Sequence, residues 1–113
     1  MLPRAHRISR GAEIVMTVRR GRRTVTPHAV VHRIPNGSDS AARFGVVVSK
    51  KVGGAVVRNR VRRRIQSICA DHLSTVPHGD LIVVRALPGS PEVGWDTLRS
   101  EIGDGLRRAV VAR

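Results

Sequence analysis

The sequence predicts an α+β fold in which helices pack on one β-sheet, with its elements in the order α-β-β-α-β-α. Three observations lead to this class. The length of 113 residues suits one domain, which we place at residues 1–113. Hydrophobic residues make up 41% of the chain, enough to build a buried core. Apolar residues recur at helical spacing in three segments and form strand-like runs in three others.

The first helix is predicted at residues 10–19, where apolar side chains recur at helical spacing. Ser9 is a suitable N-terminal cap, and Gly21 is expected to stop the helix. The apolar positions of this segment are Ile14, Val15 and Val18.

Two strands are predicted before the middle of the chain. Residues 29–34 form an apolar run, with an optional short strand near residues 24–26. A turn rich in Pro, Gly and Ser at residues 35–40 ends this run. Residues 44–49 are β-branched and almost continuously apolar, so we expect both faces of this second strand to be covered and the strand to lie centrally in the sheet.

The second half repeats the alternation of helix and strand. A Gly-Gly pair at residues 53–54 precedes an amphipathic helix predicted at residues 55–73, and a third strand follows at residues 81–86. A last helix closes the chain. The stripe of the middle helix consists of Val57, Val61, Ile65, Ile68, Cys69 and His72, and that of the last helix of Trp95, Leu98, Ile102, Leu106, Ala109 and Val110.

The charge of the chain is strongly positive and unevenly distributed. Twenty-one basic and eight acidic side chains give a net charge of +13 and a pI near 12.0. Residues 1–64 carry a net +14, whereas residues 65–113 carry −1. This balance is atypical of metabolic enzymes and predicts a polyanionic partner that binds the first half. Nineteen of the basic residues are Arg, which favours bidentate contacts to phosphate.

The densest positive charge lies between residues 43 and 64, where no acidic residue occurs. An ordinary solvated helix face mixes Glu with Arg to avoid like-charge repulsion, so a nucleic-acid surface is the better interpretation. Asn59 adds hydrogen-bonding groups, and the helix N-terminus near Ala55 adds free backbone N–H groups. The candidate nucleic-acid-binding residues are Arg43, Lys50, Lys51, Arg58, Asn59, Arg60, Arg62, Arg63 and Arg64.

Other classes of function find little support. The single cysteine, Cys69, excludes an intramolecular disulfide and a multi-cysteine zinc site, and a place in the core suits both Cys69 and His72 better than metal binding. Nucleophile-elbow and phosphate-loop motifs are absent, so no catalytic residue is assigned. No apolar stretch approaches the ~20 residues of a membrane span, and we expect a soluble cytoplasmic protein.

The stretch RFGVVVSKKVGGAVVRNRVRR at residues 43–63 resembles the signature of the protein subunit of bacterial ribonuclease P. The element Arg58-Asn59-Arg60 carries the resemblance, because it follows the strand, the Lys-Lys pair and the glycine turn in the order and spacing of that family. The likeness extends over nearly the whole chain.

The resemblance implies a subunit of an RNA-based enzyme that removes the 5′ leader of precursor tRNA. The partners would be the catalytic RNA, which holds the magnesium ions, and precursor tRNA, with no obligate protein partner. The fold would contain a left-handed βαβ crossover, as in one domain of ribosomal protein S5, although right-handed crossovers are the rule. A cleft between the first helix and the sheet would hold the leader, lined by Ile14, Val18 and His32.

This sequence departs from the family at two places. Ile14, Val18 and His32 stand where aromatic residues are usual, which predicts weaker stacking of leader bases, and Gln66 ends the basic surface early. His32 has a second interpretation, as a partly buried residue of the sheet. A stand-alone RNA-binding protein is the alternative function. A protein-only nuclease is disfavoured, because the eight acidic residues are scattered.

Overall fold

Over residues 2–35 and 38–111, which the computed structural model describes, the chain forms three α-helices and four strands in the predicted order. The optional short strand is present. The elements are α1 (Gly11–Arg20), β1 (Arg22–Val25), β2 (Ala29–Ile34), β3 (Arg43–Val47), α2 (Ala55–Ala70), β4 (Leu81–Ala86) and α3 (Trp95–Val111). In this part of the chain no helix is long and apolar enough to cross a bilayer.

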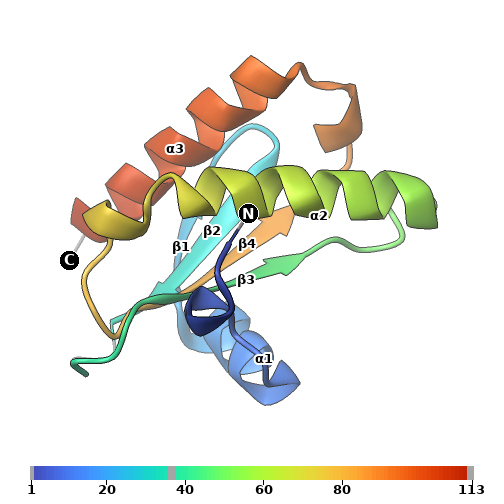
Figure 1. The fold of residues 1–113 in the computed structure, drawn as a ribbon. Coiled ribbons are helices and arrows are strands. Elements are labelled where there is room, and N and C mark those ends of the chain that lie inside the picture. Colours follow the sequence, from blue (N-terminus) through green and yellow to red (C-terminus); the bar gives the residue numbers. More distant parts are fainter. Residues whose placement is uncertain (1, 36–37, 112–113) are drawn as a thin grey trace.

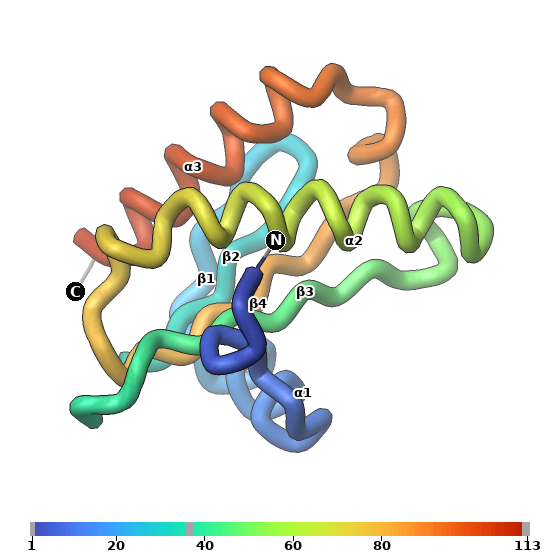
Figure 2. Tube along the Cα trace, viewed as in Figure 1, coloured from blue at the N-terminus to red at the C-terminus, as the bar shows by residue number. Residues whose placement is uncertain are grey.

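The strands form one mixed sheet in the order β1-β2-β4-β3. Strands β1 and β2, and β2 and β4, are antiparallel, whereas β3 and β4 are parallel and are connected through α2. Helices α2 and α3 lie on one face of the sheet and α1 on the other (Figures 1 and 2). Viewed as in Figure 1, β3 lies in front of β4 with α2 above them, so the crossover is left-handed, as the family resemblance implied.

The main core lies between the sheet and the pair of helices α2 and α3. Because side chains alternate along a strand, the inward residues of β2, β3 and β4 fall on this face. They meet the apolar stripes predicted for the two helices, and burial of each large aliphatic side chain stabilises the fold by about 1.5–3 kcal/mol. Residues exposed by 1% or less include Val31, Phe44, Ile82, Val84, Val61, Ile65, Ile68, Cys69, Leu98, Ile102 and Leu106.

A smaller apolar cluster joins α1 to the opposite face of the sheet. Leu81 and Val83 of β4 are buried there, and Ile14 and Val18 of α1 pack against them. Glycine permits the approach at β3, because a Cβ at Gly45 would lie 3.3 Å from Cγ1 of Ile14. α1 ends before Gly21 as predicted, because the backbone of Gly21 is extended, with ψ of 151°. Glycine suits this position, since a Cβ there would lie 2.3 Å from the Thr17 carbonyl oxygen.

The expectation that the strand at residues 44–49 lies centrally is wrong. β3 is an edge strand, and the central strands are β2 and β4. Its continuous hydrophobicity has another cause, because α2 covers one face and the α1 cluster the other. Part of its outer edge is also covered, since the Ile8 N–H donates to the Phe44 carbonyl at 2.9 Å. The strand ends at Val47, opposite Arg85 near the end of β4.

Two helix ends also differ from the prediction. α2 stops at Ala70 instead of residue 73, because tight bonds such as His72 N–H to the Cys69 carbonyl (3.0 Å) replace the helical pattern. His72 is therefore in a turn, half-buried beside Gly103 of α3. Ser9 is not the cap of α1: Arg10 occupies that position, with no side-chain cap bond.

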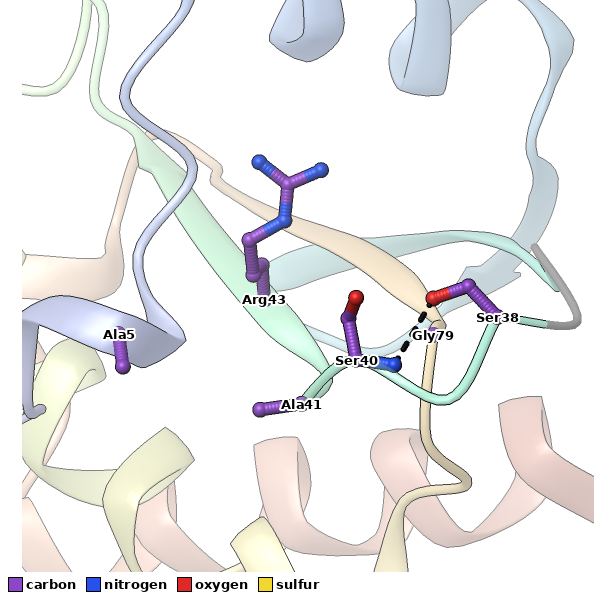
Figure 3. Close-up of a pocket in the computed structure, with 6 residues that line it drawn as sticks. All are labelled: Ala5, Ser38, Ser40, Ala41, Arg43 and Gly79. Carbon is purple, nitrogen blue, oxygen red and sulfur yellow. Dashed lines mark hydrogen bonds between the residues drawn. The ribbon is translucent and has the colours of Figure 1, made fainter.

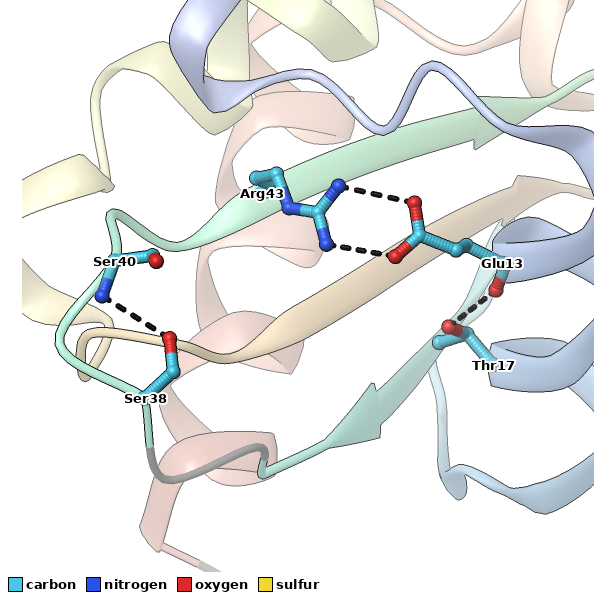
Figure 4. Close-up of polar contacts among 5 residues, drawn as sticks. All are labelled: Glu13, Thr17, Ser38, Ser40 and Arg43. Atoms are coloured by element: carbon cyan, nitrogen blue, oxygen red, sulfur yellow. Dashed lines mark hydrogen bonds and ion pairs between the residues drawn. The ribbon is translucent and has the colours of Figure 1, made fainter.

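Two arginines that form ion pairs also connect the sheet to the helices on its two faces. Nε of Arg33 donates to the buried carboxylate of Asp80, and Nη1 of Arg33 reaches the carbonyl of Ala109 on α3 at 3.3 Å. Arg43 of β3 donates two hydrogen bonds to Glu13 of α1, at 3.0 and 2.7 Å (Figure 4). Each pair links segments far apart in the sequence, and bidentate geometry is the stronger form of such a bond.

The buried thiol of Cys69 generates a first prediction. The residue is fully buried in the main core, and burial raises its pKa to about 12. Cys69→Ser places a hydroxyl in that environment and should lower the free energy of unfolding by about 1–3 kcal/mol, as measured by urea denaturation. RNA affinity should be unchanged. A Ser variant as stable as wild type would contradict the apolar character of this position.

A second prediction concerns acid stability. Hydrogen bonds from Arg43 lower the pKa of Glu13 below its ordinary value of 4.5. The pair therefore stabilises the fold above that value, and its contribution is lost as the pH falls through the lowered pKa. Wild type should be more stable than Glu13→Gln at pH 7, and the difference should shrink toward pH 3. The matched control is Glu92→Gln, at an exposed residue with no ion pair in the described structure. An equal loss of stability in the control would refute the assignment.

Candidate nucleic-acid interface

The basic surface begins in the turn that leads into α2. Lys50 and Lys51 are both exposed in this turn. A Cβ at Gly53 would lie 2.9 Å from Cγ1 of Val57, so glycine allows the turn to close against the helix. The first amides of α2 have no partner within the helix, because the first such bond runs from Arg58 N–H to the Gly54 carbonyl. Two lysines and a helix N-terminus thus attract anions at one end of α2.

α2 has an apolar side and a basic side. Its buried residues are Val61, Ile65, Ile68 and Cys69, which hold it on the sheet. Asn59, Arg60 and Arg63 are exposed on the other side, together with Val56, whose relative exposure is 73%. The apolar stripe therefore fixes which arginines face solvent.

Asn59 organises two of the neighbouring arginines. Its Oδ1 accepts a hydrogen bond from Nη1 of Arg62 at 2.8 Å, and its backbone carbonyl accepts a longer one from Nε of Arg63 at 3.4 Å. Both arginines keep further N–H donors for an external acceptor. Asn59 was predicted to contact RNA, and the structure adds this role in positioning Arg62 and Arg63.

Arg58 and Arg64 occupy the borders of the exposed face. Arg58 is half-buried, and its Nε is buried without a protein hydrogen-bond partner. Arg64 is also half-buried, and its guanidinium lies 5.8 Å from the centre of the Trp95 ring. The five arginines of α2 are thus in different environments, and Arg60 and Arg63 are the most accessible.

No arginine of α2 is paired with a carboxylate in the described parts of the chain. The ion pairs found there join Glu101 to His28, Asp80 to Arg33, Glu13 to Arg43 and Asp104 to Arg108. α2 itself contains no acidic residue. Like charges one helical turn apart repel one another, so an external polyanion would stabilise this surface.

Arg43 lies away from this surface. It is on the side of β3 that faces α1, where its guanidinium is bound to Glu13. Its side chain extends from a hollow whose other lining residues are Ala5, Ser38, Ser40, Ala41 and Gly79 (Figure 3). Of the predicted RNA-binding residues, Arg43 alone has a carboxylate partner in the described structure, and it is separate from those on α2.

The three predicted leader-cleft residues do share one face of the sheet. Ile14 and Val18 are half-buried between α1 and β4, and His32 lies on the same side of β2. His32 is only 1% exposed, and both ring nitrogens are buried without protein partners. Burial, followed by the charges of Arg85 and Arg23, lowers the pKa of His32, which favours the neutral ring. This arrangement agrees with the interpretation of His32 as a residue packed in the sheet.

A second group of exposed arginines lies where α1 joins β1. Arg19, Arg20, Arg22 and Arg23 are all exposed on either side of Gly21, whose amide donates to the Thr17 carbonyl at 2.8 Å. α1 and α2 are on opposite faces of the sheet (Figure 1). The positive charge of the first half is therefore divided between two regions of the surface.

Sequence reasoning missed the aromatic edge of the basic surface. Trp95 was assigned only to the stripe of the last helix, yet the guanidiniums of Arg64 and Arg99 both lie over its ring, the latter at 5.0 Å. The spacing of Trp95 and Arg99, four residues apart on one helix, was the available signal. The contact with Arg64 comes from another element and depends on the tertiary fold.

The carboxylates do not gather into a metal centre. Within residues 2–35 and 38–111, no group of three or more His, Cys, Asp or Glu side chains is placed to hold a metal ion. The arrangement of the basic residues suits phosphate binding, which requires donors and positive charge.

Comparisons with known proteins agree with this geometry. The sequence model of the family Ribonuclease P matches residues 2–110. The ribonuclease P protein component of Clavibacter michiganensis is 48% identical over 110 residues, covering 97% of each chain. A solved structure of the Staphylococcus aureus RNase P protein is similar with a TM-score of 0.84 and 26% identity, covering 97% of this chain and 100% of that one. A solved structure of the Thermotoga maritima RNase P protein has a TM-score of 0.79 and 27% identity, covering 90% of this chain and 96% of that one. The chain belongs to the family of bacterial ribonuclease P protein components.

Proposed function

We propose that this chain is the protein subunit of a ribonuclease P ribonucleoprotein, in which it binds the catalytic RNA and the 5′ leader of precursor tRNA. The observation that carries the proposal is the exposed face of α2, where Arg60 and Arg63 have no carboxylate partner in the described structure. Family membership supplies the identity of the RNA partners.

The contribution of the protein is electrostatic. Two RNA molecules that must approach one another repel through their phosphates, and bound arginines reduce that repulsion. The described carboxylates offer no cluster for magnesium, so the residues present do not fit a protein-held ion. The family resemblance implies that the magnesium ions are held mainly by the RNA, and we derive no catalytic step on this chain.

The leader is proposed to lie along the junction of α1 with the sheet. Ile14 and Val18 offer apolar contact there, while Arg23 and Arg85, next to His32, supply positive charge. Because His32 is buried, its ring lies beneath the surface of this region. Leader discrimination should therefore depend on apolar contact and charge more than on base stacking.

A stand-alone RNA-binding protein would share the same basic surface. The two functions differ in their effect on cleavage, because only a ribonuclease P subunit should activate the catalytic RNA at low magnesium concentration.

Reconstitution tests the proposal directly. The purified chain alone should leave precursor tRNA intact, since no metal-binding carboxylate group is found in the described structure. Addition of ribonuclease P RNA at low magnesium should give multiple-turnover cleavage that exceeds that of the RNA alone. Failure to activate the RNA would favour the stand-alone function, and cleavage by RNA-free protein would overturn the assignment.

Substitutions on α2 test the binding surface. Arg60→Ala and Arg63→Ala should each weaken binding of ribonuclease P RNA and reduce the slope of log affinity against log salt by about one unit for each lost phosphate contact. Folding should persist, because exposed arginines contribute little stability. Arg108→Ala, at an arginine that is paired with Asp104 on α3, is the control. Unfolded variants by circular dichroism would mean that these side chains are structural.

An aromatic substitution tests the leader region. Val18→Phe restores a ring where the family resemblance expects one, and base stacking is worth about 1–3 kcal/mol. The affinity for precursor tRNA relative to mature tRNA should rise. Val15→Phe is the matched control, because Val15 is on the outer side of α1 and is 51% exposed. If the ratio of the affinity for precursor tRNA to that for mature tRNA is the same in both variants and in wild type, the leader does not contact this side of α1.

A further inference from the structure

Trp95 occupies the junction between α2 and α3. It is the first residue of α3, and its half-buried ring packs against the main core. Arg64 reaches it from the middle of α2, and Arg99 from the next turn of α3. One aromatic side chain is thus contacted by arginines from two helices.

The geometry is that of a double cation–π contact. The guanidinium carbons of Arg64 and Arg99 lie 5.8 and 5.0 Å from the ring centre, inside the ~6 Å range of this interaction. A cation–π contact uses none of the five N–H donors of a guanidinium, so these groups stay available for hydrogen bonds. The ring therefore restricts both side chains and leaves their hydrogen-bonding capacity for another molecule.

The two guanidiniums contact the Trp95 ring but have no charged partner within the described structure. Neither guanidinium has a carboxylate partner or a hydrogen bond in the described parts of the chain. Asp96 is exposed and close to Arg99 in the sequence, yet it forms no ion pair with it. Arg64 is also one helical turn from Arg60, so the row of positive charge on α2 continues toward α3.

We propose that Arg64 and Arg99, held by Trp95, form a phosphate clamp that extends the RNA-binding surface from α2 onto the first turns of α3. The ligand is the sugar–phosphate backbone of RNA, because two unpaired guanidiniums suit phosphate oxygens. Trp95 is a positioning residue, since it orients the arginines and makes no contact with phosphate itself. This inference depends on the proposed function only in taking RNA as the ligand.

The test compares affinities for ribonuclease P RNA, transcribed in vitro, over a range of salt concentrations. Arg99→Gln and Arg64→Gln should each lower the affinity and reduce the slope of log affinity against log salt by about 0.7–0.9, the value expected for one phosphate contact. Trp95→Leu should reduce the slope as much as the loss of both arginines. Trp95→Phe keeps an aromatic face and should retain most of the wild-type slope.

One matched control and one comparison variant, Arg108→Gln and Arg60→Ala, separate the possible outcomes. Arg108→Gln removes an arginine of the same helix that is already paired with Asp104, and it should keep the wild-type slope. If Trp95→Leu unfolds, Arg99→Gln still tests the clamp, because Arg99 is exposed and its substitution should leave the fold intact. A wild-type slope for Arg99→Gln overturns the clamp. If Arg60→Ala lowers the slope in the same experiment, only the clamp fails; if Arg60→Ala also has no effect, the proposed RNA surface on α2 fails as well.

Discussion

The structure depends on one constraint, which is that α2 must carry five arginines and no acidic residue while remaining packed on the sheet. Four buried side chains on the inner side of the helix hold it on the sheet: Val61, Ile65, Ile68 and Cys69. Their burial contributes several kcal/mol, more than the few tenths of a kcal/mol that each like-charge pair on a helix surface costs. The fold can therefore hold an uncompensated positive surface ready for RNA.

Much of this arrangement could be predicted from the sequence, because local periodicity decides it. The buried side of α2 and the exposure of Arg60 and Arg63 follow from a repeat of 3.6 residues per turn. The placement of His32 with Val30 and Ile34 follows from the alternation of side chains along a strand. The left-handed crossover could not be derived in this way, since the general rule favours the other hand, and it came only from the resemblance to the family.

Features that depend on distant contacts were not predictable. The continuous hydrophobicity of β3 suggested a central strand, but an edge strand covered on both faces has the same pattern. Arg43 counted as part of the basic run, yet its partner Glu13 lies 30 residues away in the chain. The contact of Arg64 with Trp95 likewise joins two helices through the fold. The local sequence therefore predicted the charge of each region, but it did not predict which distant residue each arginine contacts.

The central claim is that the exposed face of α2 lies against the catalytic RNA. Because Cys69 is fully buried with a pKa raised to about 12, a cysteine introduced at the surface can be labelled selectively. Val56, on the basic side of α2, and Val25, on the edge strand β1, are both exposed and offer matched positions. The measurement is cleavage of ribonuclease P RNA by an iron chelate tethered to Val56→Cys or to Val25→Cys in the assembled complex. We expect strong localised cleavage from position 56 and much weaker cleavage from position 25, and the reverse pattern would contradict the account.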